Sequence, residues 1–135
     1  MSAPARAALA VALALAASYC GDGPTGPVTG RLLVTLAGAG PADRALLVEV
    51  TGADTSAVID SLAPVPGAPY QVFVQQIART RWRAVITGPI ADGPVLAVRV
   101  PDLSKTGLYA GTVLDVADNT FAELAPGTRR LSVAP

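Results

Sequence analysis

Apolar side chains recur at every second position in short segments along most of the chain. In RLLVTL, Leu32, Val34 and Leu36 share one face, and the same period of two returns in four later segments. Such alternation over about four to eight residues is typical of strands with one face in a core and the other in solvent. We therefore predict strands at 31–36, 46–50, 70–74, 81–86 and 95–100, with further candidates at 108–115 and 130–133.

Glycine and proline fall between these segments, as turns require. Strands that follow one another without amphipathic helices between them favour an antiparallel sandwich over a parallel α/β sheet. The prediction is an all-β domain over residues 30–135. One stretch stays open: Asp54 to Leu62 fits a helical turn, with Val58, Ile59 and Leu62 on one face, and it also fits a strand.

The N-terminal segment has the pattern of an export signal. Met1 to Arg6 carries one positive side chain, and Ala7 to Ala17 is an uninterrupted apolar run of 11 residues. A bilayer-spanning helix needs about 20 residues, so this run fits a secretory signal rather than an anchor. A buried N-terminal helix is disfavoured because helix-breaking GDGPTGP follows. We predict a signal-peptide helix within residues 1–19 and a flexible Gly/Pro-rich linker at 20–29.

Cys20, the only cysteine, directly follows that run. This arrangement resembles a bacterial lipoprotein signal, in which such a cysteine becomes the lipid-bearing first residue. Ala17 and Ser18 suit that motif, whereas Tyr19 stands where the family has a small residue. The alternative is ordinary signal cleavage between Ala16 and Cys20, which would release a secreted domain. A lone cysteine forms no internal disulfide, so the exported domain must rely on its core.

Composition removes several classes of function. The 135 residues carry 10 Lys+Arg and 10 Asp+Glu, for a formal net charge of 0, and 51% of them are hydrophobic. This balance excludes a mostly disordered chain and gives no reason to expect a nucleic-acid partner. Because the chain has no histidine, His-based triads and His-containing metal sites are excluded. We predict no enzyme activity, no cofactor and no metal.

The C-terminal half resembles a known domain family. From Arg81 to Leu124, the chain places a Gly-x-Ile loop at 88–90, an apolar strand at 96–100, a Gly-x-Tyr turn at 107–109 and a strand rich in Val, Asp and Ala at 112–118. These elements are similar to the second half of cohesin-type domains. The resemblance implies a jelly-roll or immunoglobulin-like β-sandwich, of the kind that cohesins and carbohydrate-binding modules use in extracellular assembly and recognition.

Arginines are the main candidates for binding. Arg79, Arg81 and Arg83 alternate, so on a strand their guanidinium groups would share one face and could hold carboxylates or sulfates of a polysaccharide. Arg99 is a further candidate on the next predicted strand. The alternative is a solvated face with cross-strand partners such as Glu49. Trp82 is either a core anchor or a sugar-stacking platform.

Acidic residues offer weaker candidates. Asp115, Asp118 and Asn119 could form a calcium site at a strand end, although their spacing does not match an EF-hand, and turn capping explains them equally. Ser104 and Lys105 are adjacent and would face opposite ways on an extended chain, so a Ser-Lys nucleophile is not expected. The remaining aspartates fall in or beside predicted turns, where solubility and capping are sufficient roles: Asp43, Asp54, Asp60, Asp92 and Asp102.

These observations predict an exported, non-catalytic module of the cell envelope that is cohesin-like and binds a protein or a glycan, or takes part in surface assembly. Its partner would be a protein or polysaccharide at the cell surface, together with the membrane if Cys20 is acylated. The expected binding face is flat and carries residues such as Arg31, Thr35, Arg81, Arg83 and Arg99. The alternative is a small secreted hydrolase, which needs carboxylates that converge in a cleft.

Overall fold

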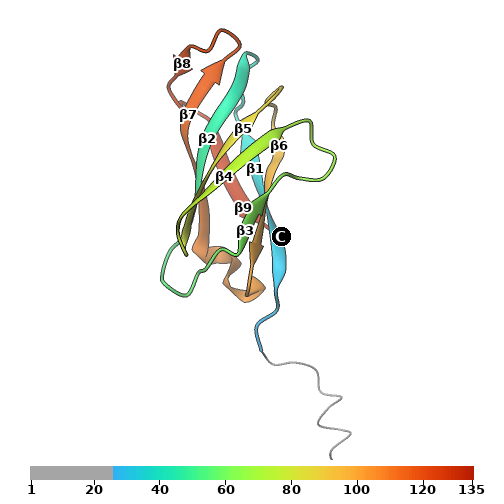
Figure 1. The fold of residues 1–135 in the computed structure, drawn as a ribbon, viewed down its shortest axis with the longest axis vertical. Helices are drawn as coiled ribbons and strands as arrows, with labels where there is room; N and C mark the ends of the chain where they lie inside the picture. Colours follow the sequence, from blue (N-terminus) through green and yellow to red (C-terminus); the bar gives the residue numbers. More distant parts are fainter. Residues whose placement is uncertain (1–25) are drawn as a thin grey trace, which may run out of the picture.

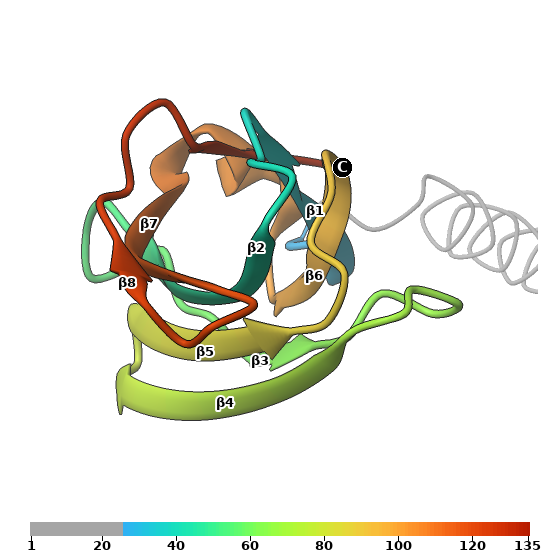
Figure 2. The same ribbon diagram turned by 90° about the horizontal axis from the view of Figure 1, so that it is seen from above.

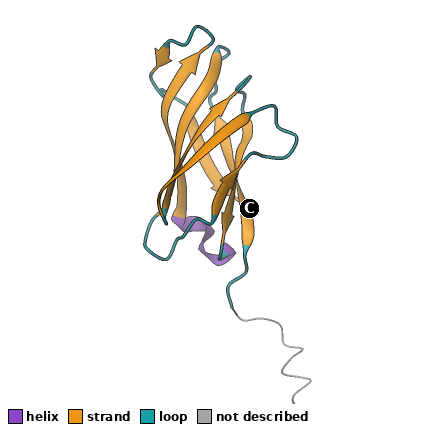
Figure 3. Cartoon of the chain, viewed as in Figure 1, coloured by secondary structure: helices purple, strands orange, loops and turns teal. Residues whose placement is uncertain are grey.

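The computed structural model describes residues 26–135. The predicted signal peptide, Cys20 and the first part of the predicted linker lie outside the described residues. Within residues 26–135, the chain forms nine strands and one short 3-10 helix, η1 (Leu103–Leu108), which caps one end of the molecule (Figure 3). Every strand pair is antiparallel. The prediction of an all-β domain is therefore confirmed.

The strands form two sheets that pack face to face (Figures 1 and 2). The four-stranded sheet has the order β3 (Ser61–Ala63), β6 (Gly93–Val100), β1 (Gly30–Ala37) and β9 (Arg130–Ala134). The five-stranded sheet has the order β4 (Gln71–Ala78), β5 (Arg81–Thr87), β2 (Asp43–Gly52), β7 (Tyr109–Asp118) and β8 (Glu123–Leu124). Only β4–β5 and β7–β8 are neighbours both in sequence and within one sheet, so the remaining connections pass between the sheets.

The core lies between the two sheets and is built from the alternating positions. Because successive side chains on a strand point to opposite faces, one parity of each central strand is sequestered from water. The predicted inward faces of β1, β2, β5 and β6 are confirmed. Their fully or almost fully buried members are Leu32, Val34, Leu36, Leu46, Val48, Val50, Ala84, Ile86, Leu96, Val98 and Val100.

The stretch that the sequence left open, residues 54–62, is neither a helix nor a long strand. Asp54 to Ser56 forms a turn, the chain then runs extended, and β3 begins only at Ser61. Ala57 and Ile59 point into the core. The Tyr109 hydroxyl donates a 2.6 Å hydrogen bond to the carbonyl oxygen of Val58 and holds this segment between the sheets. The short elements β8 and η1 carry no clear periodicity and were not predicted, and β3 overlaps only the end of the stretch for which a strand was one of two alternatives.

The two long sides of the sandwich differ. On one side, β9 packs against β7, and a Cβ atom at Gly111 would stand only 3.0 Å from Cβ of Leu131. On the other side, β3 has three residues, whereas its neighbour across the gap, β4, has eight. Figure 2 shows β4 as the outermost strand, beside β5. The first side is closed by packing, and the second side is open along β4.

The strand prediction for β4 is confirmed, but its expected half-buried character is wrong. Val72 is partly buried, whereas Val74 on the same face is 44% exposed and Phe73 on the opposite face is 62% exposed. The four-stranded sheet does not extend over this strand, so neither face of β4 is fully covered. No helix within residues 26–135 has the length and apolar character needed to cross a membrane.

Candidate functional site

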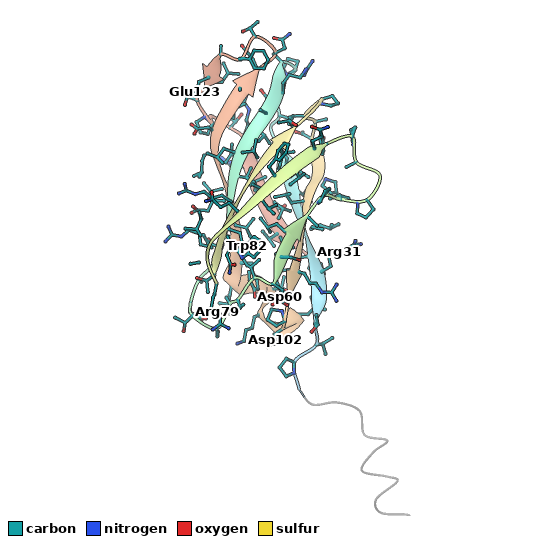
Figure 4. All side chains as sticks on the ribbon, in the orientation of Figure 1. Arg31, Asp60, Arg79, Trp82, Asp102 and Glu123 are labelled. Carbon is teal, nitrogen blue, oxygen red and sulfur yellow. The ribbon has the colours of Figure 1, made fainter. Side chains whose placement is uncertain are left out.

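The predicted arginines do not form one surface. Arg79 lies in the turn between β4 and β5, and Arg81 and Arg83 point outward from β5 in the five-stranded sheet. Arg99 points outward from β6 in the other sheet, directly opposite Arg31 of β1. Figure 4 shows Arg31 and Arg79 on opposite sides of the lower half of the molecule. The single flat face expected from the sequence is replaced by two separate outer faces.

Arg83 forms the cross-strand ion pair that the sequence suggested. Its Nε donates a 2.9 Å hydrogen bond to Oε2 of Glu49, which lies opposite it on β2. The side chain of Arg83 is 42% exposed and that of Glu49 is 18% exposed. This pair neutralises Arg83 at one end of the three alternating arginines, whereas Arg81 at their centre forms no ion pair within the part of the chain that the structure describes.

An apolar row crosses the outer face of the five-stranded sheet. Phe73 of β4 lies opposite Val85 of β5, and Val85 lies opposite Leu47 of β2. We call these three residues the outer row. Phe73 is 62% exposed and Val85 is 38% exposed.

Two shallow depressions lie along the outer row and share Leu47 and Val85. One, of about 340 Å³, also includes Phe73 and Arg83 in its lining. The other, of about 290 Å³, also includes Asp115 and Glu123. The outer face of this sheet therefore offers a continuous apolar surface with charged side chains at its borders.

Sequence reasoning missed the outer row, although its signal was present. The segment YQVFV was interpreted by one parity only, with Tyr70, Val72 and Val74 on the inner face. Phe73 at the other parity is the larger side chain. Val85 likewise stands among the outward positions of β5. Apolar side chains at both parities of neighbouring strands indicate a sheet with a second apolar face.

Trp82 points inward from β5 and packs against the core (Figure 4). The core-anchor interpretation is therefore confirmed, and the inward direction leaves no sugar-stacking platform at this residue. Its Nε1 atom is buried without a hydrogen-bond partner among the described residues. The indole thus contributes apolar area at the cost of one unsatisfied donor.

Three aspartates cap turns through the same local motif, Asp-x-Ser/Thr. In each case a carboxylate oxygen accepts hydrogen bonds from the backbone N–H and the hydroxyl group two residues later, which is the capping role that the sequence suggested. These hydrogen bonds hold the pKa of each carboxyl below its usual value, with the hydroxyl donor as the largest cause. The pairs are Asp54 with Ser56, Asp102 with Ser104, and Asp118 with Thr120.

The calcium candidates do not converge. Asp115 points outward from the middle of β7, opposite Leu47, whereas the Asp118 carboxylate accepts hydrogen bonds from the backbone N–H groups of Thr120 and Ala122. Within residues 26–135, no cluster of three or more acidic, His or Cys side chains has the arrangement of a metal site. The Asp118 carboxylate thus stabilises the turn between β7 and β8.

Asp43 has a role that the sequence did not reveal. It begins β2 with 0% exposure, and its carboxylate binds Arg129 through two hydrogen bonds of 2.6 Å from Nε and Nη2. Gly40 donates a third hydrogen bond from its backbone, at 2.8 Å. The pKa of Asp43 is lowered, chiefly by the Arg129 hydrogen bonds. This pair ties the turn between β1 and β2 to the loop that leads into β9.

Two glycines leave space for the Asp43–Arg129 pair and the loop that carries Arg129. A Cβ atom at Gly40 would stand 2.9 Å from Nη2 of Arg129, and one at Gly38 would stand 2.6 Å from the carbonyl oxygen of Thr128. Gly38 also has a φ of +80°, a conformation that favours glycine. The Gly-Ala-Gly turn therefore allows the loop before β9 to pack directly on the end of β1.

The hydroxyl group of Tyr109, at the opposite end of the molecule from Asp43, has a raised pKa. The pKa of Tyr109 is raised, first by burial and then by the negative charges of Asp60, Asp102 and Asp54. Asp60 and Asp102 lie at the same end as η1, and Glu123 lies at the other end (Figure 4). Among the described aspartates with a resolved change, every pKa is lowered.

Comparisons with protein-family models, with curated proteins and with solved structures found no match for this chain.

Proposed function

We propose that the chain is a non-catalytic binding module of the cell envelope that recognises a protein partner through the outer face of its five-stranded sheet. The observation that carries this proposal is the outer row of Phe73, Val85 and Leu47 with its two connected depressions. Exposed apolar side chains that gather in one patch, bordered by charged groups, are typical of protein interaction sites.

A protein partner fits this face better than a glycan. Sugar rings stack on exposed Trp or Tyr side chains, whereas here Trp82 points inward and Tyr109 is buried. The Tyr70 hydroxyl accepts a hydrogen bond from the backbone of Ala91. The side chains left on the outer row are aliphatic or phenyl groups, which match an apolar segment of another protein.

The distribution of carboxylates supports a non-catalytic role. Asp54, Asp102 and Asp118 cap separate turns, and Asp43 is occupied by Arg129. A hydrolase needs at least two such groups directed at one substrate. Hydrolytic activity that disappears in Asp102→Asn and persists in Glu49→Gln would contradict this part of the proposal.

The cohesin-like resemblance and the export signal complete the proposal. We infer a sandwich of the jelly-roll or immunoglobulin-like type, presented outside the cell and tethered by an acyl group on Cys20. The alternating passage of the chain between two antiparallel sheets supports the first inference. The second is tested by the intact mass of the protein purified from its native membranes. A mature chain that starts at Cys20 with added acyl mass is expected, and an unmodified soluble chain would contradict it.

Binding is tested with residues 26–135 immobilised as bait for envelope proteins, followed by titration with the captured partner after purification. Val85→Lys places a charge in the middle of the outer row and should weaken binding by at least about tenfold. Arg99→Glu changes an exposed residue of the other sheet and should leave binding unchanged. Equal binding by both variants, or binding of purified envelope glycans alone, would overturn the proposed face.

A further inference from the structure

The strands at the borders of the two sheets differ sharply in length. An open sheet edge exposes unpaired N–H and C=O groups, and natural proteins protect such edges by shortening, charging or covering them. β3 has three residues, β8 has two, and β9 has five and packs against β7. β4 has eight residues and pairs only with β5. Among the described strands, β4 is the one long edge without such protection.

The side chains of β4 also lack the usual protection. No charged residue lies between Asp60 and Arg79, a stretch that includes the whole strand and the loop before it. Phe73 is 62% exposed, Val74 is 44% exposed and Ile77 is 43% exposed. Half of the six large apolar side chains exposed in the described chain therefore belong to this one strand. Hydrogen-bonding groups and apolar side chains are thus exposed together at the same edge.

We propose that β4 pairs antiparallel with β4 of a second copy of this chain, which joins two five-stranded sheets into one sheet of ten strands. Antiparallel pairing places the two strands about a two-fold axis, so each copy presents the same surface to the other. The backbone groups at the edge would be satisfied, and the second copy would cover part of the apolar side chains of β4.

The lack of charge on β4 and the lengths of the border strands favour a second copy of this chain as the partner that pairs with β4. An uncharged strand offers nothing to attract a basic or acidic peptide, and two uncharged strands meet without repulsion. Head-to-tail stacking is disfavoured because the opposite border of the same sheet, β8, has only two residues to offer. The assembly therefore closes at two copies.

This inference goes beyond the proposed partner binding and does not depend on it. The dimer uses the edge of β4, whereas the partner would lie on the face of the sheet. Pairing would place the two outer rows on one continuous face, so that a bivalent partner would meet both. The dimer can be measured without any partner present.

The first test is the mass of residues 26–135 in solution, by sedimentation or light scattering across a range of concentrations. This part of the chain contains both sheets and the core. Wild type should show twice the monomer mass. Val74→Lys places a charge at the edge and should give a monomer, whereas Val85→Lys, the same substitution on a strand paired on both sides, should remain a dimer.

The measured masses are interpreted only for variants that are folded. Fluorescence of Trp82, the single tryptophan, verifies that each variant is folded. A wild-type monomer at every concentration up to about 1 mM, an open-ended oligomer, or a folded Val74→Lys dimer would each overturn the proposal. Loss of partner binding in Val85→Lys with the dimer intact would leave both proposals standing and separate them.

A second test does not rely on disrupting the edge. Residues 26–135 contain no cysteine, so Gln75→Cys introduces a single thiol at an exposed position of β4. A short bifunctional maleimide should link two copies of this variant into a covalent dimer. Ser132→Cys, exposed on the border strand β9 of the other sheet, is the matched control and should stay monomeric. Equal cross-linking of both variants would contradict pairing through β4.

Discussion

The closed and open sides of this sandwich are both formed by strands with alternating apolar residues, but they differ in how far those residues are buried. On the closed side, β7 and β9 pack together, and the pair of Asp43 and Arg129 fixes the loop that leads into β9. On the open side, β4 extends past the three-residue strand β3, and its apolar side chains remain in contact with solvent. The difference shows that side-chain burial depends on which strand lies across the gap.

A comparison of β1 and β4 makes the same point with matched lengths. Both strands have eight residues and alternate aliphatic side chains on their inner face. Val34 of β1 has 0% exposure, because β1 has a neighbour on each side and a full sheet opposite. Val74 of β4 is 44% exposed. The hydrophobic contribution of these positions to folding should scale with the area that each one removes from water.

The largest effect is expected at the buried ion pair of the closed side. Asp43→Ala leaves the Arg129 guanidinium, whose side chain is 13% exposed, without its partner. Removing one member of a buried pair costs about 3–5 kcal/mol, and the free energy of unfolding in urea should fall accordingly. Glu49→Ala, which removes the partner of the exposed Arg83, should cost at most about 1 kcal/mol. Similar losses in both variants would mean that Asp43 adds no more than a surface pair does.

The next largest effect is a difference in the free energy of unfolding between substitutions in β1 and in β4. Leu32→Ala on β1 should lower the free energy of unfolding by about 2–5 kcal/mol, because it leaves a cavity in the closed core. Val74→Ala should lower the stability of the monomer by less than about 1 kcal/mol, since much of that side chain is already in water. Urea titrations monitored by Trp82 fluorescence measure both. A large loss at Val74, measured at concentrations where the protein is monomeric, would show that another part of the same chain covers this position.

The smallest expected effect is the pH dependence that Asp43 alone gives to the free energy of unfolding. Its pKa in the folded protein lies below the usual value of 3.8, mainly because Arg129 donates hydrogen bonds to the carboxylate. A group whose folded pKa is lowered stabilises the protein above its unfolded pKa, and this stabilisation is lost as the pH falls through the folded value. The stability advantage of wild type over Asp43→Asn should therefore begin to shrink below about pH 5 and continue to shrink as the pH falls through the folded pKa.

The capping aspartates provide the internal control for this experiment. Asp54 and Asp102 also have lowered pKa values, and because they hydrogen-bond within their own turns at the end of the molecule that carries η1, they should titrate alike in wild type and in Asp43→Asn. Their contribution cancels in the difference between the two proteins. A difference that stays constant across the acidic range would show that the charge of Asp43 does not stabilise the closed side.

Much of the fold could be predicted because the alternation of the central strands is strong. The inward faces of β1, β2, β5 and β6 follow directly from positions such as Leu32, Val48, Ile86 and Val98. Strands of two or three residues, such as β3 and β8, could not be predicted, because alternation needs a longer run to be recognised. Segment 54–62 could not be assigned either, because the core contact of Ile59 and the bond from Tyr109 depend on strands distant in sequence.

The candidate site was predicted less well than the fold. The sequence correctly suggested Glu49 as a partner for Arg83 and the core as the place of Trp82. It grouped Arg99 with Arg81, although the two residues belong to different sheets. It also gave Asp43 an ordinary turn role, because the partner that buries it, Arg129, lies 86 residues away.

Local sequence pattern was enough to establish that residues 30–135 form strands, where most of these strands begin, and which parity of the central strands is apolar. Those properties follow from local geometry, because a strand turns alternate side chains to opposite faces. The neighbours of each strand, the position of β4 at an open edge, and the alignment of the outer row became known from the folded structure alone. Sheet order and edges are decided by pairings between distant segments, and alternation within a strand is the same whether that strand lies at the centre or at the border.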